Sequence, residues 1–248
     1  MTTSGTTGFN LNLTEIVEEA FERAGGELRS GYDLRTARRS LNLLFADWAN
    51  RGLNMFTFEQ GSINLTPGIA TYPLPDDTVD LLEHVIRTGA GNQATQADLS
   101  ISRISISTYA TIPNKIQQAR PIQILVNRNS GAAYPIDSEY SPGQTASPSV
   151  TLWPVPDNSQ QYVLVYWRLR RIQDAGHGNN TFDIPFRFLP CLVAGLAYYL
   201  ALKIPDGYSR LADLKVMYDE AWEVAATEDR EKAAARFVPR QQFIGNGW

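Results

Sequence analysis

The stretch FLPCLVAGLAYYLAL, residues 188–202, decides the fold. Its apolar residues, among them Leu192 and Leu196, recur on nearly every side of a helix, and a helix that is hydrophobic all round is a buried one. Pro190 lies near its start, where proline is tolerated. The Pro-Asp-Gly sequence at 205–207 then ends it. The stretch therefore predicts a buried helix.

Two further helices are expected before this one and another after it. The first begins at Asn12, which has capping-box spacing to Glu15, and ends at Gly25. The second covers about 33–51, and the last covers about 209–236, of which 227–236 loses the apolar stripe and is expected to project from the core. The apolar face of the last helix consists of Leu211, Leu214, Met217, Tyr218, Ala221, Trp222 and Ala225. Because helices this short cannot bury their stripes alone, we infer that the N- and C-terminal helices pack into one body.

The first two helices carry opposite charges on their outer faces. At helical spacing, the first presents an acidic face and the second a basic face. These residues are Glu15, Glu18, Glu19 and Glu22 on the first helix and Arg35, Arg38 and Arg39 on the second. We therefore expect the two faces either to pair with each other or to meet a copy of the same chain.

Between the helices the hydrophobic period changes from 3.6 to 2, which indicates strands. Strands are expected at 55–66 with an interruption at Gly61-Ser62, and then at 69–74, 79–88, 122–127, 150–153 and 162–172. The predicted class is α+β, with a β-rich domain at 53–181 inserted into a helical body made of 12–52 plus 182–236.

Both ends of the chain lie outside these two parts. Residues 1–11 are expected to be a flexible N-terminus and neither a signal peptide nor a transit peptide. Residues 237–248 contain Pro and Gly and are not helical, yet they are rich in apolar side chains, unlike a disordered tail. They are predicted to form a docking arm through Phe237, Val238, Pro239, Arg240, Phe243, Ile244 and Trp248.

The composition of the 248 residues excludes several classes of protein. Hydrophobic residues make up 43% and charged residues 19%, as in globular proteins, and the net charge of -4 argues against a general nucleic-acid binder. With one cysteine and two histidines, neither an internal disulfide nor a His/Cys zinc centre is expected. The longest apolar run, 188–202, is too short to cross a bilayer. We expect a soluble protein of a reducing compartment, with no cofactor and no metal.

Candidate catalytic groups are few. His84 lies in an apolar strand pattern and is interpreted as structural, whereas His177 lies in a Gly-rich loop without a nucleophile motif nearby. Cys191 begins the buried helix, where a thiol is inert packing.

Two carboxylates at a fixed separation can catalyse glycoside hydrolysis, so two acidic pairs are candidates for that role. Asp76-Asp77 lies in a Pro-rich turn, where Asp bonds to its local backbone, and Asp137 with Glu139 lies in a polar loop. Both pairs are interpreted as structural. Gly89-Ala90-Gly91 lacks the further residues of a phosphate-binding loop.

Two other basic sets accompany the arginines of the second helix. Arg236 and Arg240 flank the arm, and Arg168, Arg170 and Arg171 end the last strand. The nearby aromatics, Tyr162, Tyr166 and Trp167, suggest stacking on single-stranded nucleic acid, although an alternating strand must turn about half of them toward a core. A solvated or intersubunit role is the favoured interpretation.

In the order of its features, the chain resembles the head-to-tail adaptor (connector) proteins of short-tailed bacteriophages. The resemblance covers about 12–236, and only the order of its motifs is specific. They are LTEIVEEAFERAG at 13–25, ARRSLNLL at 37–44, WANRGLN at 48–54, YPLP at 72–75, Arg120-Pro121, LWPVPD at 152–157, the buried stretch 189–202 and the Ala-rich last helix.

The resemblance implies a structural virion protein of the portal vertex or neck, assembled in the host cytoplasm, and not an enzyme. Such proteins form a ring, commonly of twelve copies, below the portal protein. The ring extends the channel for double-stranded DNA, retains the packaged genome and carries the next tail component, which is a nozzle, tail tube, or tail fibre or spike. In such rings the C-terminal segment reaches along the portal, a role that falls here to 237–248.

Two features of the chain agree with this implication. A closed ring needs two different complementary faces on each copy, and the acidic and basic faces provide them. A channel in which DNA slides avoids many phosphate contacts, and the chain is net acidic. The first alternative is a nucleic-acid-binding module, and the less favoured second alternative is a virion-associated cell-wall hydrolase.

Overall fold

A computed structural model of the chain describes residues 5, 11–29, 31–51, 55–128, 148–176 and 180–229. Its helices are α1 (Leu13–Ala24), α2 (Gly31–Asn50), α3 (Ile106–Ala110), α4 (Leu189–Ala201) and α5 (Leu211–Glu228), with short 3-10 helices η1 (Met55–Thr57), η2 (Phe186–Phe188) and η3 (Pro205–Arg210). Its strands are β1 (Phe58–Asn64), β2 (Thr71–Pro73), β3 (Thr78–Thr88), β4 (Ala97–Ser100), β5 (Ser102–Ile104), β6 (Gln123–Asn127), β7 (Ser149–Trp153) and β8 (Tyr162–Arg170). The predicted α+β class is confirmed.

The ends of α1 follow from local chemistry. The Asn12 side chain accepts a hydrogen bond from the backbone N–H of Glu15, and the Glu15 carboxylate accepts one from the backbone N–H of Asn12. This reciprocal capping box satisfies two amides that the helix itself leaves unbonded. Gly25 ends the helix in the left-handed conformation, with φ of 87°. Both predicted ends of this helix are confirmed.

The helix α4 lies at the centre of the helical part. Residues 191–197 are all buried, and α1, α2 and α5 all contact α4. Buried residues of these four helices form one hydrophobic cluster. Gly195 allows the closest approach, because a Cβ there would lie 2.9 Å from the Tyr218 ring on α5 and 3.1 Å from Leu44 on α2.

A network of hydrogen-bonded side chains crosses this core. The indole N–H of Trp48, which is fully buried, donates to the Tyr218 hydroxyl at 2.9 Å, and that hydroxyl donates to Asp47 at 3.2 Å. Arg51 pairs with Asp47, and its guanidinium lies 4.8 Å from the centre of the Tyr218 ring. Burial is the main cause that raises the pKa of Tyr218. This network thus connects α2 to α5, and its buried polar groups all have hydrogen-bond partners.

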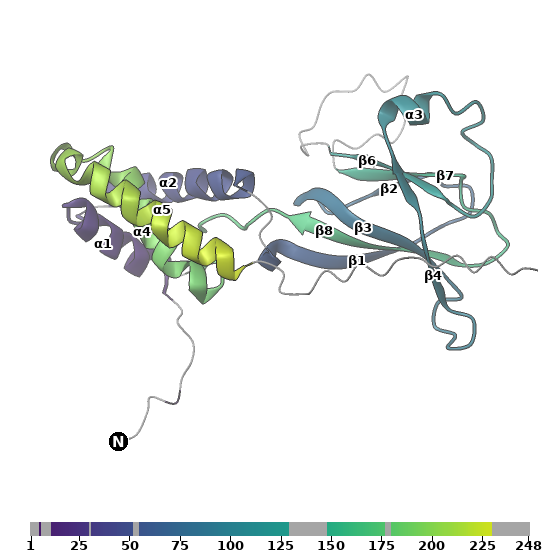
Figure 1. Ribbon diagram of the computed structural model, residues 1–248, viewed down its shortest axis with the longest axis horizontal. Helices are drawn as coiled ribbons and strands as arrows, with labels where there is room; N and C mark the ends of the chain where they lie inside the picture. The colour runs from purple at the N-terminus through teal and green to yellow at the C-terminus, as the bar shows by residue number, and fades with distance from the viewer. Residues whose placement is uncertain are drawn as a thin grey trace, which may run out of the picture.

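The strands form two four-stranded sheets, in the orders β1-β8-β3-β4 and β2-β7-β6-β5. Pairs are antiparallel except β5 with β6, which are parallel. A second hydrophobic cluster draws on both sheets, for example Ile86 and Leu164 from the first with Ile124 and Leu152 from the second. The two sheets therefore pack face to face. The sheets lie at one end of the molecule and α1, α2, α4 and α5 lie at the other (Figure 1).

Several expected element boundaries were wrong. The interruption at Gly61-Ser62 is absent, since β1 pairs with β8 without a break from Phe58 to Asn64. Gly61 lies opposite Tyr166, and a Cβ at Gly61 would come within 2.4 Å of the Tyr166 ring. This glycine therefore accommodates an aromatic neighbour instead of ending the strand.

The last helix also differs from its prediction. It begins at Leu211, because 205–210 form η3, and Met217 is about half exposed although it was assigned to the buried face. Of the stretch expected to project, only 227–229 lie within the described residues: Thr227 and Glu228 are exposed, whereas Asp229 is 5% exposed and forms an ion pair with Arg187.

We predict that Gly195→Val lowers the free energy of unfolding by about 1–3 kcal/mol, because added methyl groups overpack the contact with Tyr218 and Leu44. Urea unfolding followed by circular dichroism measures this. The matched control is Ala212→Val on the exposed side of α5, which costs only the difference in helix propensity, about 0.5 kcal/mol. Equal losses in the two variants would contradict the close approach at Gly195.

Candidate functional site

The predicted acidic face lies on the exposed side of α1. Glu15, Glu18, Glu19 and Glu22 are all exposed. Glu15 belongs to the capping box, and Glu19 pairs with Arg23 one turn further along at 2.8 Å. Such exposed pairs contribute little to stability because water solvates both charges. The acidic face therefore contributes charge to the surface but little to the stability of the fold.

The predicted basic face lies on α2 and borders a concave surface. Arg35, Arg38 and Arg39 are exposed and, with Tyr32, line a hollow of about 400 Å³. An adjoining groove of about 490 Å³ lies between α2, the end of α1 and the end of α4. It is lined by two basic residues, one acidic residue and otherwise apolar or uncharged residues: Arg39 and Lys203, Asp33, and Phe21, Tyr32, Thr36, Leu43, Leu200 and Ile204.

Sequence reasoning found the arginines of this groove but missed its apolar and lysine members. Tyr32 is 63% exposed and Leu43 is 60% exposed. Both lie outside the buried stripe of α2. An apolar residue outside that stripe was the feature of the sequence that could have indicated an exposed apolar surface. Lys203 donates to the Ser40 hydroxyl at 2.7 Å, and its pKa is lowered by burial and by the neighbouring Arg39. The groove thus combines positive charge with exposed apolar side chains.

The arginines at the end of β8 have a structural role. Arg168 is 7% exposed and forms ion pairs with Glu59 on β1 and with Asp77, and it also donates to the Thr78 hydroxyl. The hydrogen bond from Arg168 is the main cause that lowers the pKa of Asp77. Asp77 is therefore an acceptor for a buried arginine that is distant in sequence, whereas the sequence had suggested a bond to the local backbone.

Arg170 connects the sheets to the helical part. It forms a two-point ion pair with Asp183, which lies in the segment that leads into η2 and α4. The backbone N–H of Arg171 donates to the Asp77 carbonyl at 2.8 Å. The guanidinium groups of Arg168 and Arg170 therefore bind carboxylates within the chain at the junction of its two parts, and Arg171 contributes a backbone hydrogen bond there.

The aromatic residues of β8 do not form a stacking platform. Tyr162 is 2% exposed and Tyr166 is 4% exposed, and both belong to the core between the sheets. Trp167 points to the other side of the strand and is 36% exposed. The observation that favoured binding of single-stranded nucleic acid is thereby removed.

The remaining candidates within the described residues are partly or fully buried. Cys191 is fully buried, and burial raises the pKa of its thiol to about 12. His84 lies on β3 opposite Tyr166, and among the described residues its Nδ1 atom has no hydrogen-bond partner. Burial, the largest cause, and Arg103 lower the pKa of His84, while Glu83 and a hydrogen bond to the Ile101 backbone raise it.

Some predicted residues lie outside the described part of the chain. They are His177, Asp137, Glu139, Arg236 and the arm residues at 237–248, including Arg240. Within the described residues, no three His, Cys, Asp or Glu side chains are grouped so as to hold a metal ion. A search of the same residues found no helix with the length and hydrophobicity to span a membrane.

We predict that His84 makes the stability of the fold depend on pH. Burial lowers the pKa of His84 in the folded state below its ordinary value of 6.5. Above pH 6.5 the imidazole is neutral in both the folded and the unfolded chain. As the pH falls through 6.5 the unfolded chain takes up a proton before the folded chain does, and the free energy of unfolding decreases. Urea unfolding at about pH 7.5 and about pH 5.5 should show a larger loss for the native chain than for His84→Gln, which does not titrate. Equal losses would mean that His84 keeps its ordinary pKa.

The model of the family described as SU10 adaptor protein matches residues 11–240. No curated protein sequence matches the chain.

Proposed function

The chain belongs to the SU10 adaptor protein family, and we propose that it forms a ring beneath the portal protein of its bacteriophage. Membership makes it a structural component of the virion, a head–tail adaptor that takes part in tail assembly. The observation that carries the proposal is the match of one adaptor family over residues 11–240, nearly the whole chain.

In the proposed ring, twelve copies extend the channel for double-stranded DNA and retain the packaged genome. The face away from the portal carries the next tail component, a nozzle, tail tube, or tail fibre or spike. We further propose that the virus is short-tailed, as the order of sequence motifs suggests. DNA would pass without sequence-specific binding, and the internal pairing of Arg168 and Arg170 supports this because neither is directed at a phosphate.

We assign a separate role to each part of the chain. The helical body, residues 12–52 and 182–236, would pack copy against copy, with the charged faces of α1 and α2 at the boundaries between copies. The β-rich part, 53–181, would face outward or toward the tail. Two separate hydrophobic clusters, one of helices and one of sheets, support this division. The segment 237–248 would dock on the portal, and residues 1–11 would be a flexible N-terminus.

A chain that ends at Arg236 should no longer join the portal. The apolar residues of 237–248 would supply the surface that is buried against it, so their loss removes that contact. Mixing purified chain with portal rings, followed by size-exclusion chromatography and electron microscopy, measures the joining. The matched control carries residues 237–248 in a reordered sequence, which keeps composition and length.

Each outcome of this experiment has a definite meaning. If the full chain joins the portal and both variants fail, a specific docking arm is supported. If the truncated chain joins as well as the full chain does, the arm is wrongly assigned although the adaptor function stands. If the full chain does not join and instead binds DNA with a steep dependence on salt, the proposed function itself fails.

A further inference from the structure

The outer side of α2 carries a strip in which apolar and positive side chains alternate. We call Tyr32, Arg35, Arg39 and Leu43 the α2 strip; they recur at helical spacing, so they share one side of the helix. Tyr32 and Leu43 are largely exposed, and Tyr32, Arg39 and Leu43 border the groove that Lys203 also lines. The strip thus presents apolar surface beside positive charge at the edge of a hollow.

The outer side of α5 carries a strip with the same spacing and the opposite charge. We call Asp213, Val216, Met217, Glu220 and Val224 the α5 strip, and all of them are exposed. Val216 is 55% exposed and Val224 is 69% exposed, and together with the exposed Met217 they place apolar surface along one side of the helix. Tyr32 and Leu43 are as far apart in sequence as Asp213 and Val224, so at ~1.5 Å per residue the two strips have equal length.

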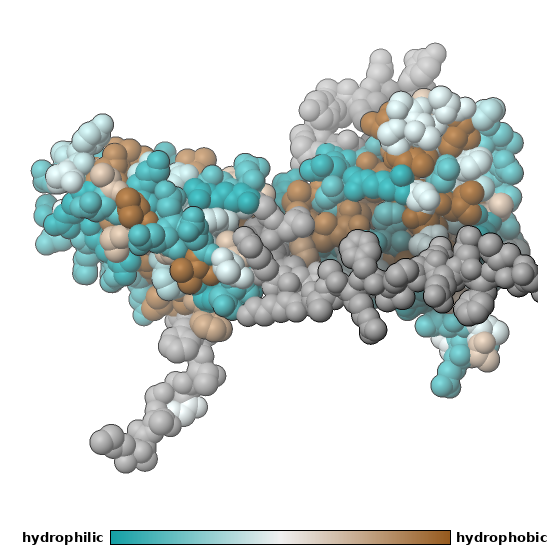
Figure 2. All heavy atoms as spheres, in the orientation of Figure 1, coloured by the Kyte–Doolittle hydropathy of each residue, from teal (hydrophilic) through white to brown (hydrophobic). Residues whose placement is uncertain are grey.

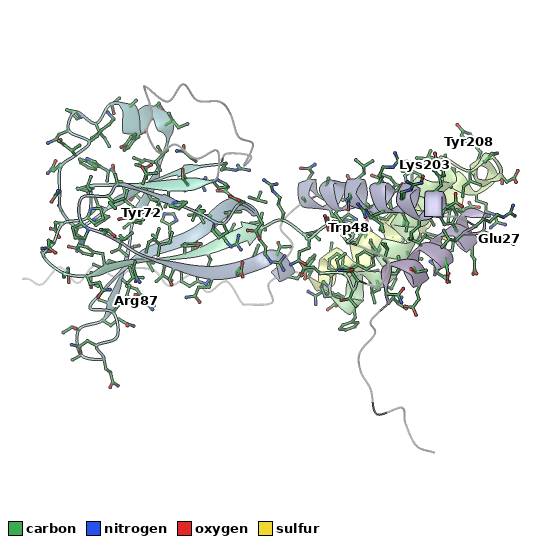
Figure 3. The ribbon with its side chains drawn as sticks, turned by 180° about the vertical axis from the view of Figure 1, so that it is seen from behind. Glu27, Trp48, Tyr72, Arg87, Lys203 and Tyr208 are labelled. Atoms are coloured by element: carbon green, nitrogen blue, oxygen red, sulfur yellow. The ribbon has the colours of Figure 1, made fainter. Side chains whose placement is uncertain are left out.

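The two strips face different sides of the molecule. The helix α5 lies in front in Figure 1, whereas α2 lies in front in Figure 3, which views the molecule from behind. In Figure 2, which has the orientation of Figure 1, brown apolar atoms lie among teal ones over α5. One copy therefore offers the α5 strip on one side and the α2 strip on the other, as contact between successive copies of a ring requires.

We propose that the α5 strip of one copy packs onto the α2 strip and groove of the next copy. Valine and methionine side chains would cover Tyr32 and Leu43, and Asp213 and Glu220 would lie near Arg35, Arg39 and Lys203. The inference rests on the proposed ring and names the surfaces that join its copies. It assigns to α5 the contact that the sequence alone assigned to the acidic face of α1.

The preference for α5 over α1 follows from the apolar content of the two faces. The acidic residues of α1 offer charge but little apolar surface, and Glu15 and Glu19 already bind within α1. Exposed ion pairs alone contribute little to the free energy of association, because each charge gives up about as much interaction with water as it gains from its partner. Burial of apolar surface is the main favourable contribution to association, and the α5 strip supplies it together with charge.

A crosslinking experiment tests the contact in the full chain assembled on the portal or in virions. The double variant Thr36→Cys/Met217→Cys places thiols near the middle of the two strips, so that parallel and antiparallel packing both bring them within reach of a short thiol crosslinker. Covalent multimers that extend to the size of the ring are expected. Native Cys191 is buried and does not interfere.

The controls separate the possible outcomes. Each variant with only one of the two added cysteines should remain monomeric after crosslinking, because the two surfaces differ. The variant Thr36→Cys/Glu18→Cys tests the acidic face of α1 instead. Multimers from that pair, or from neither pair while electron microscopy still shows rings, would overturn the inference and leave the ring in place. Absence of rings from the native chain would overturn the proposed function.

A charge exchange provides an independent measurement. Arg39→Glu alone and Glu220→Arg alone should each weaken ring formation at least tenfold, the size of effect expected for like charges placed together in an interface. The double variant Arg39→Glu/Glu220→Arg should recover most of it. If the double variant assembles no better than the weaker single variant, the acidic residues of the α5 strip do not lie near the basic residues of the α2 strip, and the inference is wrong.

Discussion

Burial of α4 is the constraint on which the rest of the fold depends. A helix that is apolar on nearly every side has to be surrounded, and α1, α2 and α5 surround it. These helices come from both ends of the described chain, so the strands between them must leave the helical part and return to it. The path back passes through Arg170 and Asp183, whose ion pair binds the end of β8 to the segment that precedes α4. One buried helix thus explains why the two ends of the sequence make a single core.

The distribution of charge follows from the same arrangement. Arginines at the junctions are used inside the chain: Arg168 and Arg170 bind carboxylates around β8, Arg51 binds Asp47, and Arg187 binds Asp229 at the end of α5. Arginines on the outer side of α2 instead remain at the surface beside exposed apolar residues. An exposed surface that carries both positive charge and apolar side chains is compatible with membership in an adaptor family.

Local features could be predicted from the sequence, and features that depend on distant partners could not. The capping box of α1 involves residues three apart, and the buried helix is defined by its own composition, so both were foreseen. Gly61 was misread because its meaning depends on Tyr166, which lies far away in the sequence. Arg168 was likewise ambiguous until Glu59 and Asp77 were seen beside it. Met217 was assigned to the buried face because spacing gives the side of a helix only approximately, and the packing against α4 decides which edge of that side is covered.

The placement of the two strips bears on how such a chain assembles. A surface that joins copies must not be satisfied by its own chain, or the copies would have no reason to associate. The α2 and α5 strips lie on different sides of one helical core, so a single copy does not bring them together. Two different faces that complement each other propagate from copy to copy, and they close into a ring when the rotation between neighbours divides a full turn. The body built around α4 fixes the angle between the strips and would therefore also set the number of copies.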